Sequence, residues 1–332
     1  MRRRSLLLAA VPAGLVTLAG CGDDSSDSSS AVASPSASAS PPPKIVEGPL
    51  PAITAGRRFG EKPTVAKGPG TPSKNLAVRT VIAGGGRTVA ENEFIRADYL
   101  GQIWDTGKVF DNSYDRKRPL VMQLAQGSII DGWRYALQGK RTGSRVQIAV
   151  PPALGYGEGG NPKAGIKGTD TLVFVIDLIE SFNSKSSAKG TPVPQTDAAL
   201  PKVGTGTDGG APKVTVPQAA PPKKLVSRYV LEGDGPELKA DQTVLCQFQG
   251  LVWDGGKTFE RTYGSGRLSQ FSLQQMREVV KGLAQGLTGK KVGSRVLIVV
   301  PPELAYGDKP PGGGAIKKGS TLVFTVDILA AM

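Results

Sequence analysis

The chain of 332 residues carries the same series of short motifs twice, about 150 residues apart. Gly-Ser-Arg-Val begins at Gly143 and again at Gly293, and Thr-Leu-Val-Phe begins at Thr171 and again at Thr321. A repeat of this length is too long for a solenoid, whose units have roughly 20–50 residues, and is typical of a duplicated globular domain. The sequence therefore predicts two domains, each large enough to bury its own core.

The repeat extends upstream of these motifs and sets the domain boundaries. Leu50-Pro51 corresponds to Leu200-Pro201, which adds an N-terminal extension to each core. We expect domain 1 at residues 50–182, with its core at about 75–182, and domain 2 at residues 200–332, with its core at about 224–332. Residues 183–199 are rich in Ser, Thr, Pro and Ala, a composition that predicts a linker.

Hydrophobic periodicity indicates mainly strands. Residues 146–150 and 172–176 are β-branched runs suited to buried strands, and residues 94–100 alternate loosely. The one clear helix in domain 1 covers residues 130–137, and its counterpart covers residues 276–287. Several strands with one short amphipathic helix predict an α+β domain, in which an antiparallel sheet curls over the helix.

The N-terminus has the features of an export signal. Arg2-Arg3-Arg4 precedes a short apolar stretch that ends in Leu18-Ala19-Gly20-Cys21, which resembles a bacterial lipobox. We expect residues 1–20 to be a signal peptide, read either as an ordinary or as a twin-arginine signal, and Cys21 to be lipidated. Residues 21–49 have the Ser/Pro/Ala composition of a disordered tether. These features predict an extracytoplasmic lipoprotein anchored to the bacterial cell membrane.

Composition removes several classes of chemistry. The chain has no histidine, which excludes Ser-His-Asp and Cys-His nucleophiles, His-ligated zinc and a histidine general base. Cys246 lies in a strand-like stretch and is expected to be a small buried hydrophobe. The formal charge of +13 falls to +10 without the three arginines of the signal, and no basic cluster is interleaved with aromatics, so we expect no nucleic-acid partner.

Five ordered motifs in domain 1 resemble those of the FKBP-type peptidyl-prolyl cis-trans isomerases. They are Tyr99-x-Gly101, Gly107-x-Val109-Phe110-Asp111-Asn112-Ser113, Ile129-Ile130-Asp131-Gly132-Trp133, Leu154-Gly155-Tyr156-Gly157 and Thr171-Leu172-Val173-Phe174. The resemblance implies an apolar, aromatic pocket and needs no cofactor and no metal. Its residues here would be Tyr99, Phe110, Asp111, Ile129, Ile130, Trp133, Tyr156, Ile166 and Phe174, with Leu120 where the family often has phenylalanine.

The second copy resembles the family less closely at the pocket positions. Phe248, Glu260 and Leu283 stand where domain 1 has Tyr99, Asp111 and Trp133. The corresponding pocket would be formed by Phe248, Phe259, Glu260, Val279, Val280, Leu283, Tyr306, Ile316 and Phe324. The loss of the large ring at Leu283 predicts weaker binding and isomerisation of prolyl peptides by domain 2.

The resemblance implies a peptidyl-prolyl isomerase that assists the folding of exported proteins. Its partners would be unfolded or exported polypeptides with X–Pro bonds, with a macrolide of the tacrolimus or rapamycin kind as a pocket ligand. One alternative is a prolyl-peptide-binding chaperone in which isomerisation is incidental, since two linked sites raise avidity. A purely structural envelope lipoprotein would require an inactive first pocket, and the pocket residues of domain 1 argue against it.

Overall fold

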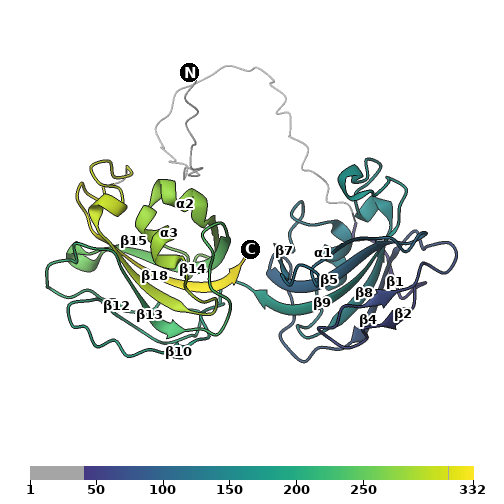
Figure 1. Cartoon of the computed structure of the whole chain (residues 1–332), viewed down its shortest axis with the longest axis horizontal. Helices are drawn as coiled ribbons and strands as arrows, with labels where there is room; N and C mark the ends of the chain where they lie inside the picture. The colour runs from purple at the N-terminus through teal and green to yellow at the C-terminus, as the bar shows by residue number, and fades with distance from the viewer. Residues whose placement is uncertain (1–40, 313) are drawn as a thin grey trace, which may run out of the picture. The chain divides into compact units, whose positions relative to one another are not determined.

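The structure is a computed structural model that describes residues 41–312 and 314–332. Figure 1 shows two sheet domains. The elements of domain 1 are β1 (Ile45–Val46), β2 (Ile53–Ala55), β3 (Thr64–Val65), β4 (Leu76–Ile82), β5 (Phe94–Ile103), β6 (Val109–Asn112), β7 (Leu120–Gln123), α1 (Asp131–Leu137), β8 (Arg145–Val150) and β9 (Leu172–Phe182), with short 3₁₀ turns at Pro152–Leu154 and Pro162–Ala164.

The main sheet of domain 1 has seven strands in the order β1-β4-β8-β9-β5-β6, with β7 also paired to β5. All pairs are antiparallel except β1 with β4. Helix α1 covers one face, and the β2–β3 hairpin lies on the other (Figure 1). Because both faces are covered, every residue of β8 is buried, with Ile148 in the core beneath α1 and Ala149 in the core beneath the hairpin.

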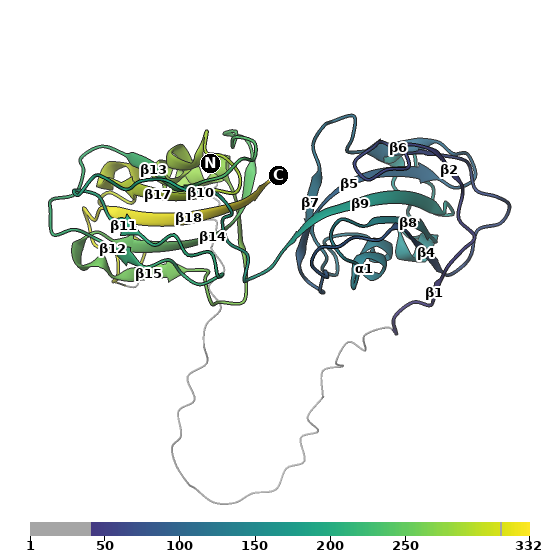
Figure 2. The ribbon, with the colours of Figure 1, turned by 90° about the horizontal axis from the view of Figure 1, so that it is seen from below.

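Domain 2 repeats this plan, with the sheet order β10-β13-β17-β18-β14-β15 and β16 paired to β14. Figure 2 shows β11 and β12 across the β14 and β18 strands. The elements are β10 (Thr191–Pro192), β11 (Lys202–Val203), β12 (Val214–Thr215), β13 (Val226–Glu232), β14 (Thr243–Val252), β15 (Thr258–Arg261), β16 (Ser269–Ser272), α2 (Leu273–Val279), α3 (Lys281–Leu287), β17 (Arg295–Val300) and β18 (Leu322–Ala331), with 3₁₀ turns at Asp254–Gly256 and Pro302–Leu304.

The predicted fold class is confirmed, with one correction in domain 2. The single helix expected at residues 276–287 is two helices, α2 and α3, that meet at Val280. Val280 has φ −134° and ψ 87°, a non-helical conformation that interrupts the chain of helical hydrogen bonds. Ser272 caps α2, because its side-chain oxygen accepts a hydrogen bond from the Gln275 N–H. Domain 1 has a loop at residues 124–130 where domain 2 has α2.

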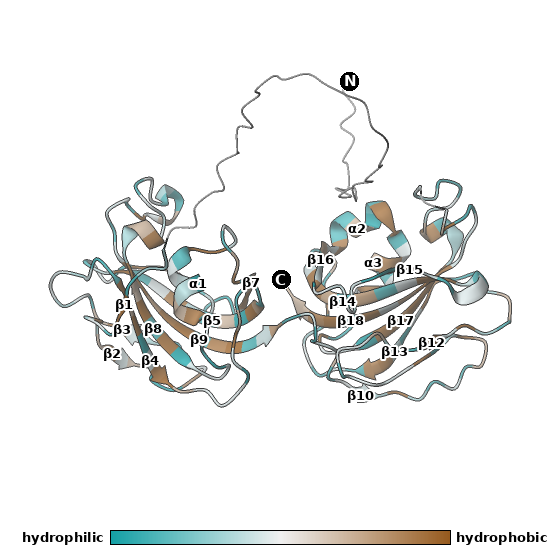
Figure 3. Ribbon diagram, turned by 180° about the vertical axis from the view of Figure 1, so that it is seen from behind, coloured by the Kyte–Doolittle hydropathy of each residue, from teal (hydrophilic) through white to brown (hydrophobic). Residues whose placement is uncertain are grey.

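The N-terminal extension of each domain forms a hairpin on the outer sheet face. Ile53 and Val65 pack there with Trp104 in domain 1, and Leu200 and Val203 pack with Trp253 in domain 2. Figure 3 shows that the central strands of both sheets, such as β8 and β17, are largely apolar (brown). Both tryptophans also donate to a backbone oxygen of their own extension. The extensions are therefore structural parts of the two domains.

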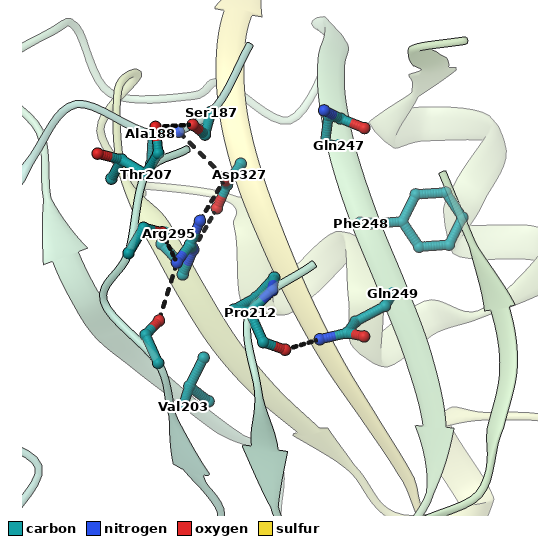
Figure 4. A network of polar contacts seen from close by, with 12 residues as sticks. Ser187, Ala188, Val203, Thr207, Pro212, Gln247, Phe248, Gln249, Arg295 and Asp327 are labelled. Carbon is teal, nitrogen blue, oxygen red and sulfur yellow. Dashed lines mark hydrogen bonds and ion pairs between the residues drawn. The ribbon is translucent and has the colours of Figure 1, made fainter. Parts of the chain in front are cut away.

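The arginine of each Gly-Ser-Arg-Val motif fastens the extension to the sheet. Arg145 and Asp177 are fully buried and form an ion pair at 2.6 Å, and Arg145 Nη2 also donates to the Glu61 carbonyl at 2.7 Å. Arg295 pairs with Asp327 at 2.6 Å and donates to the carbonyls of Gly204 and Gly206, both at 2.8 Å (Figure 4). The repeated motif thus joins the sheet to backbone carbonyls of each extension.

Residues 183–199, expected as a linker, pack against domain 2. The Ala188 N–H donates to Asp327 Oδ2 at 3.1 Å, and the N–H groups of Lys189 and Gly190 donate to the Gly293 carbonyl (Figure 4 shows the first contact). Strand β10 then pairs with β13. The tether expected at residues 21–49 is likewise not disordered at Ile45–Val46, because these apolar residues pair with Leu76–Ala77 at the sheet edge.

Several expectations concern residues outside the described part of the chain. The signal peptide at residues 1–20, the lipidated Cys21 and the tether up to residue 40 all lie there. None of the helices between residues 41 and 332 that the structure describes has the length and apolarity of a membrane crossing. Cys246 is fully buried in β14, and its burial raises the pKa of the thiol, so the thiol is an inert packing group.

Candidate functional site

Domain 1 contains a cavity of about 560 Å³ between α1, the sheet and the loops beside them. This volume lies within the range of roughly 300–1,000 Å³ that small-ligand sites occupy. Strands β5, β6 and β9 and helix α1 contribute four aromatic side chains, and the loops before α1 and after β8 contribute further lining residues. The lining residues are Tyr99, Phe110, Asp111, Leu120, Met122, Gly127, Ser128, Ile129, Ile130, Asp131, Trp133, Gly155, Tyr156 and Phe174.

Eight of the nine residues that the family resemblance placed in this pocket line the cavity, and Ile166 does not. Ile166 is 3% exposed and packs in the hydrophobic core next to the cavity. Leu120 and Met122 do line it, two positions apart on β7, so strand alternation could have suggested the pair. Gly127 and Ser128 had no signal in the sequence, because their place depends on the conformation of a loop.

Four aromatic rings form the apolar wall of the cavity. Trp133 makes edge-to-face contacts with Tyr99 and with Phe174, both at 5.4 Å between ring centroids, and Phe174 contacts Phe110 at 5.7 Å. Such contacts contribute about 0.5–1.5 kcal/mol each beyond the burial of area. Trp133 is 3% exposed and is fixed from two sides, which makes it a rigid surface for an apolar ring.

Two glycines bring these elements close enough together. A Cβ on Gly101 would lie 2.7 Å from Phe110 Cζ and 2.8 Å from Phe174 Cε1, so only glycine leaves room for both rings. A Cβ on Gly132 would lie 2.5 Å from Val150 Cγ1, so glycine lets α1 pack directly on β8. The glycines of the Tyr-x-Gly and Asp-Gly-Trp motifs therefore position the aromatic wall.

A polar network stands on one side of the cavity. Tyr99 Oη donates to Asp111 Oδ2, Arg116 Nη1 donates to Asp111 Oδ1, and Arg116 Nη2 donates to Tyr99 Oη at 3.1 Å. Burial, followed by the hydrogen bond to Asp111, raises the pKa of Tyr99 to about 12. Burial opposes ionisation of Asp111, but the hydrogen bonds from Tyr99 and Arg116 outweigh it and lower the pKa of that carboxyl. At neutral pH the hydroxyl is therefore protonated and the carboxylate ionised.

Two further polar groups border the cavity. Ile130 is the N-cap residue of α1, and no hydrogen bond from its backbone N–H is found within residues 41–312 and 314–332. Tyr156 follows the 3₁₀ turn at Pro152–Leu154, and 40% of its surface is exposed. Both groups are donors at the edge of an apolar space, which suits a peptide whose carbonyl oxygens need partners while an apolar group is enclosed.

The corresponding positions of domain 2 form a different site. Of the aromatic contacts, the pair Phe259 and Phe324 remains, with centroids 5.8 Å apart. Val280, Leu283, Ile316 and Phe324 are buried in the core, Phe248, Phe259 and Tyr306 are partly buried beside it, and Glu260 and Val279 are exposed. Phe248 has no hydroxyl to offer Glu260, and Ser265 stands at the position of Arg116.

Helix α2 changes the site further. The Val280 N–H, which corresponds to that of Ile130, donates to the Met276 carbonyl at 2.8 Å. This donor is therefore already used inside the chain. Burial and then the charge of Glu260 raise the pKa of Tyr306, so its hydroxyl stays protonated at neutral pH.

Domain 1 thus combines an antiparallel sheet over a short helix with an aromatic cavity that has hydrogen-bond donors at its rim. The family model "FKBP-type peptidyl-prolyl cis-trans isomerase" matches residues 85–179 and 235–329, which are more than half of the chain. The chain belongs to this family of enzymes.

Individual proteins with similar sequences have names of the same family. An "FK506-binding protein" of Streptomyces anulatus is 40% identical over 119 residues, which are 36% of this chain and 95% of that protein. The isomerase FkpA of Escherichia coli K12 is 35% identical over 143 residues, 43% of this chain and 50% of that protein. Human FKBP9 is 28% identical over 244 residues, 73% of this chain and 35% of that protein. The chain thus spans about half or less of the length of the last two.

Proposed function

We propose that domain 1 isomerises X–Pro bonds in exported polypeptides, and that domain 2 binds the same chains more weakly or turns them over more slowly. The observation that supports this division most directly is the cavity of domain 1, where Trp133 is held between Tyr99 and Phe174. Domain 2 has Leu283 at the tryptophan position. The aromatic floor is therefore a property of the first copy.

The proposed mechanism uses binding alone. Rotation about an X–Pro bond has a barrier of ~18–20 kcal/mol, because amide resonance is lost when the bond twists. A twisted amide has less charge on its carbonyl oxygen and therefore needs less solvation than the planar forms. A dry aromatic cavity that fits the bent proline binds this state better than either ground state. No nucleophile or proton relay takes part, which is consistent with a chain without histidine.

Each lining residue has a proposed role in this step. Trp133 supports the proline ring from below, and Tyr99, Phe110 and Phe174 enclose it from the sides. The Ile130 N–H and the Tyr156 hydroxyl donate to substrate carbonyls and hold the peptide in its bent form. Asp111 acts through Tyr99, whose hydroxyl it orients. The same cavity would take a macrolide of the kind that the name of the Streptomyces relative implies.

The site of action is proposed from the N-terminal sequence. Arg2-Arg3-Arg4, the apolar stretch after it and Cys21 support export and lipidation, which would anchor the chain to the outer side of the cell membrane. A Ser/Pro/Ala-rich tether would then hold the domains away from the lipid. When cells that carry the Cys21→Ser variant are fractionated, we expect the protein in the medium. Unchanged membrane association would refute lipid anchoring.

The alternative that we retain is a chaperone that grips prolyl segments with two linked sites. Trp133→Leu in the full chain separates the two functions. Isomerase activity is expected to lose about tenfold or more in kcat/KM on an X–Pro peptide, which corresponds to about 1.4 kcal/mol of transition-state binding. Leu283→Ala, at the matched position, is expected to change it by less than about twofold. Equal losses in both variants would overturn the division of labour, whereas retained suppression of aggregation by Trp133→Leu would favour the chaperone.

A further inference from the structure

Domain 2 contains a cavity that shares no lining residue with its candidate prolyl site. It has a volume of about 360 Å³ and lies between the segment 193–201 and strands β13 and β17. Its buried apolar lining includes Leu200, Val230 and Leu297, which are 8%, 1% and 3% exposed. The lining also includes Tyr229 and two cationic side chains, Arg228 and Lys290. The cavity thus has an apolar interior beside two cations.

Neither cation has an acidic partner among the residues that the structure describes. The contrast with the next residue is direct, since Lys291 forms an ion pair with Glu232 at 2.7 Å. Lys290 Nζ instead lies 4.3 Å from the centroid of the Tyr229 ring. Burial, and then repulsion from Arg228, lowers the pKa of Lys290, and the charge of Glu232, which already pairs with Lys291, offsets this only in part. An anion placed at the cavity would relieve that repulsion.

Asp197 also lines the cavity, and its carboxylate accepts a hydrogen bond from the backbone of its own turn. Its Oδ1 accepts a hydrogen bond from the Ala199 N–H at 3.0 Å. Gln195, on the same segment, exchanges two hydrogen bonds with the backbone of Val203, which holds the segment against the domain. The wall that encloses the cavity is therefore held in place by its own contacts.

Domain 1 has the same two cations, but each has a partner. Arg79 donates to Gln147 Oε1 at 2.6 Å, and Lys140 donates to Thr80 Oγ1 at 3.1 Å. Arg79 pairs with Gln147 across β4 and β8, as Arg228 pairs with Leu297 across β13 and β17. Two sequence differences, Leu297 for Gln147 and Tyr229 for Thr80, therefore remove both partners in domain 2 and leave apolar surface in their place.

From this arrangement we propose that the cavity beside β13 binds an organic anion, a carboxylate joined to an apolar body. The carboxylate lies at Arg228 and Lys290, and the apolar body covers Tyr229, Leu200 and Leu297. Such a group occurs in a free fatty acid and at the C-terminus of a peptide that ends in an apolar residue. The binding site is separate from the isomerase cavity of domain 1.

The test is a titration of the full chain with octanoate, with octanol and octylamine as neutral and cationic counterparts. Octanoate is expected to bind at least about tenfold more tightly than octanol, since charge-assisted hydrogen bonds add to the apolar contact. Lys290→Met is expected to weaken octanoate binding about tenfold and to leave X–Pro isomerisation unchanged. Lys140→Met, the matched change in domain 1, is expected to leave octanoate binding unchanged.

Leu297→Gln provides a second, independent variant. It restores the partner that Arg79 has in domain 1 and is expected to weaken octanoate binding. A peptide with a free C-terminal leucine, compared with its C-terminal amide, distinguishes the two sources of the carboxylate. Binding of octanoate alone identifies a fatty acid, and preference for the free peptide identifies a chain terminus. The proposal is wrong if octanol binds as tightly as octanoate, if Lys290→Met binds octanoate normally, or if neither acid binds.

Discussion

The two domains share their scaffold and differ in their prolyl sites. Arg145 with Asp177 and Arg295 with Asp327 repeat almost atom for atom. By contrast, the hydroxyl, the short carboxylate and the indole of the first site are all replaced in the second. The buried ion pair and the strands are therefore common to both copies of the fold, whereas the aromatic and polar residues of the site differ between them.

The connection before the site helix is the second difference. Residues 124–128 of domain 1 form a loop with Gly127 at φ +78°, and residues 273–278 of domain 2 form most of α2, with one more residue and no glycine. The helix supplies the Met276 carbonyl that accepts from the Val280 N–H. A change of Leu283 to tryptophan would therefore restore the ring but leave the Val280 N–H bound to the Met276 carbonyl.

The largest effect is expected where the domains are alike. Arg145→Met leaves the Asp177 carboxylate buried without its countercharge, and should destabilise domain 1 by about 3–5 kcal/mol. Hydrogen exchange of residues 53–65 should rise first, since Arg145 holds that hairpin. Arg295→Met should do the same in domain 2, where residues 202–215 respond. Urea unfolding measures the stability of both variants. A loss of unfolding free energy below about 1 kcal/mol in either domain would show that the ion pair does not stabilise both domains.

The next effect concerns the difference between the domains. In a Trp133→Leu background, Leu283→Trp alone should raise kcat/KM on an X–Pro peptide by about fivefold. The same change combined with residues 124–128 in place of 273–278 should raise it by about thirtyfold, because an aromatic contact and a freed N–H each contribute about 1 kcal/mol. Full rescue by Leu283→Trp alone would mean that α2 has no influence on the site.

Most of the residues that the resemblance placed in the pocket line one cavity, and they lie in compact sequence motifs. Trp133 follows a glycine that α1 needs to approach β8, and Gly101 follows Tyr99 at the position where two rings meet. Both signals are local and physical. The strands of the main sheet were equally clear, since a largely apolar run such as residues 146–150 must be covered on both sides.

The sequence did not predict what depends on tertiary contacts. Residues 183–199 have a linker's composition, yet Ala188 is 1% exposed because its N–H meets a buried carboxylate. Ile166 belongs to the pocket by resemblance, but its side chain packs in the core. The division of the helix expected at residues 276–287 into α2 and α3 was also missed, because the break at Val280 comes from a backbone angle and not from a proline or glycine.

A smaller effect is expected from Tyr99→Phe, which gives domain 1 the side chain of Phe248. The change removes the donor to Asp111 and the acceptor for Arg116 without altering the ring contact with Trp133. Loss of one hydrogen bond of this kind costs about 1 kcal/mol, so kcat/KM should fall about fivefold. Phe248→Tyr in domain 2 should give no comparable gain. If Tyr99→Phe keeps full activity, the network only supports the fold.

The smallest effect separates the charge of that network from its rings. Arg116→Ser introduces the residue that domain 2 has at Ser265, and removes an ion pair whose side chains are 50% and 39% exposed. At pH 7 the loss of stability should be about 0.5 kcal/mol, as for other exposed pairs. The pKa of Asp111 is lowered in the folded chain, so its contribution is complete above the ordinary carboxyl pKa of about 3.9 and is lost as the pH falls through the lowered value. The wild-type chain and Arg116→Ser should therefore differ at pH 7, and the difference should shrink as the pH falls from about 4 through the lowered pKa of Asp111. Urea midpoints measured between these limits test this, and a difference that stays constant or grows in acid would show that Arg116 acts through packing on the Tyr99 ring, not through its charge.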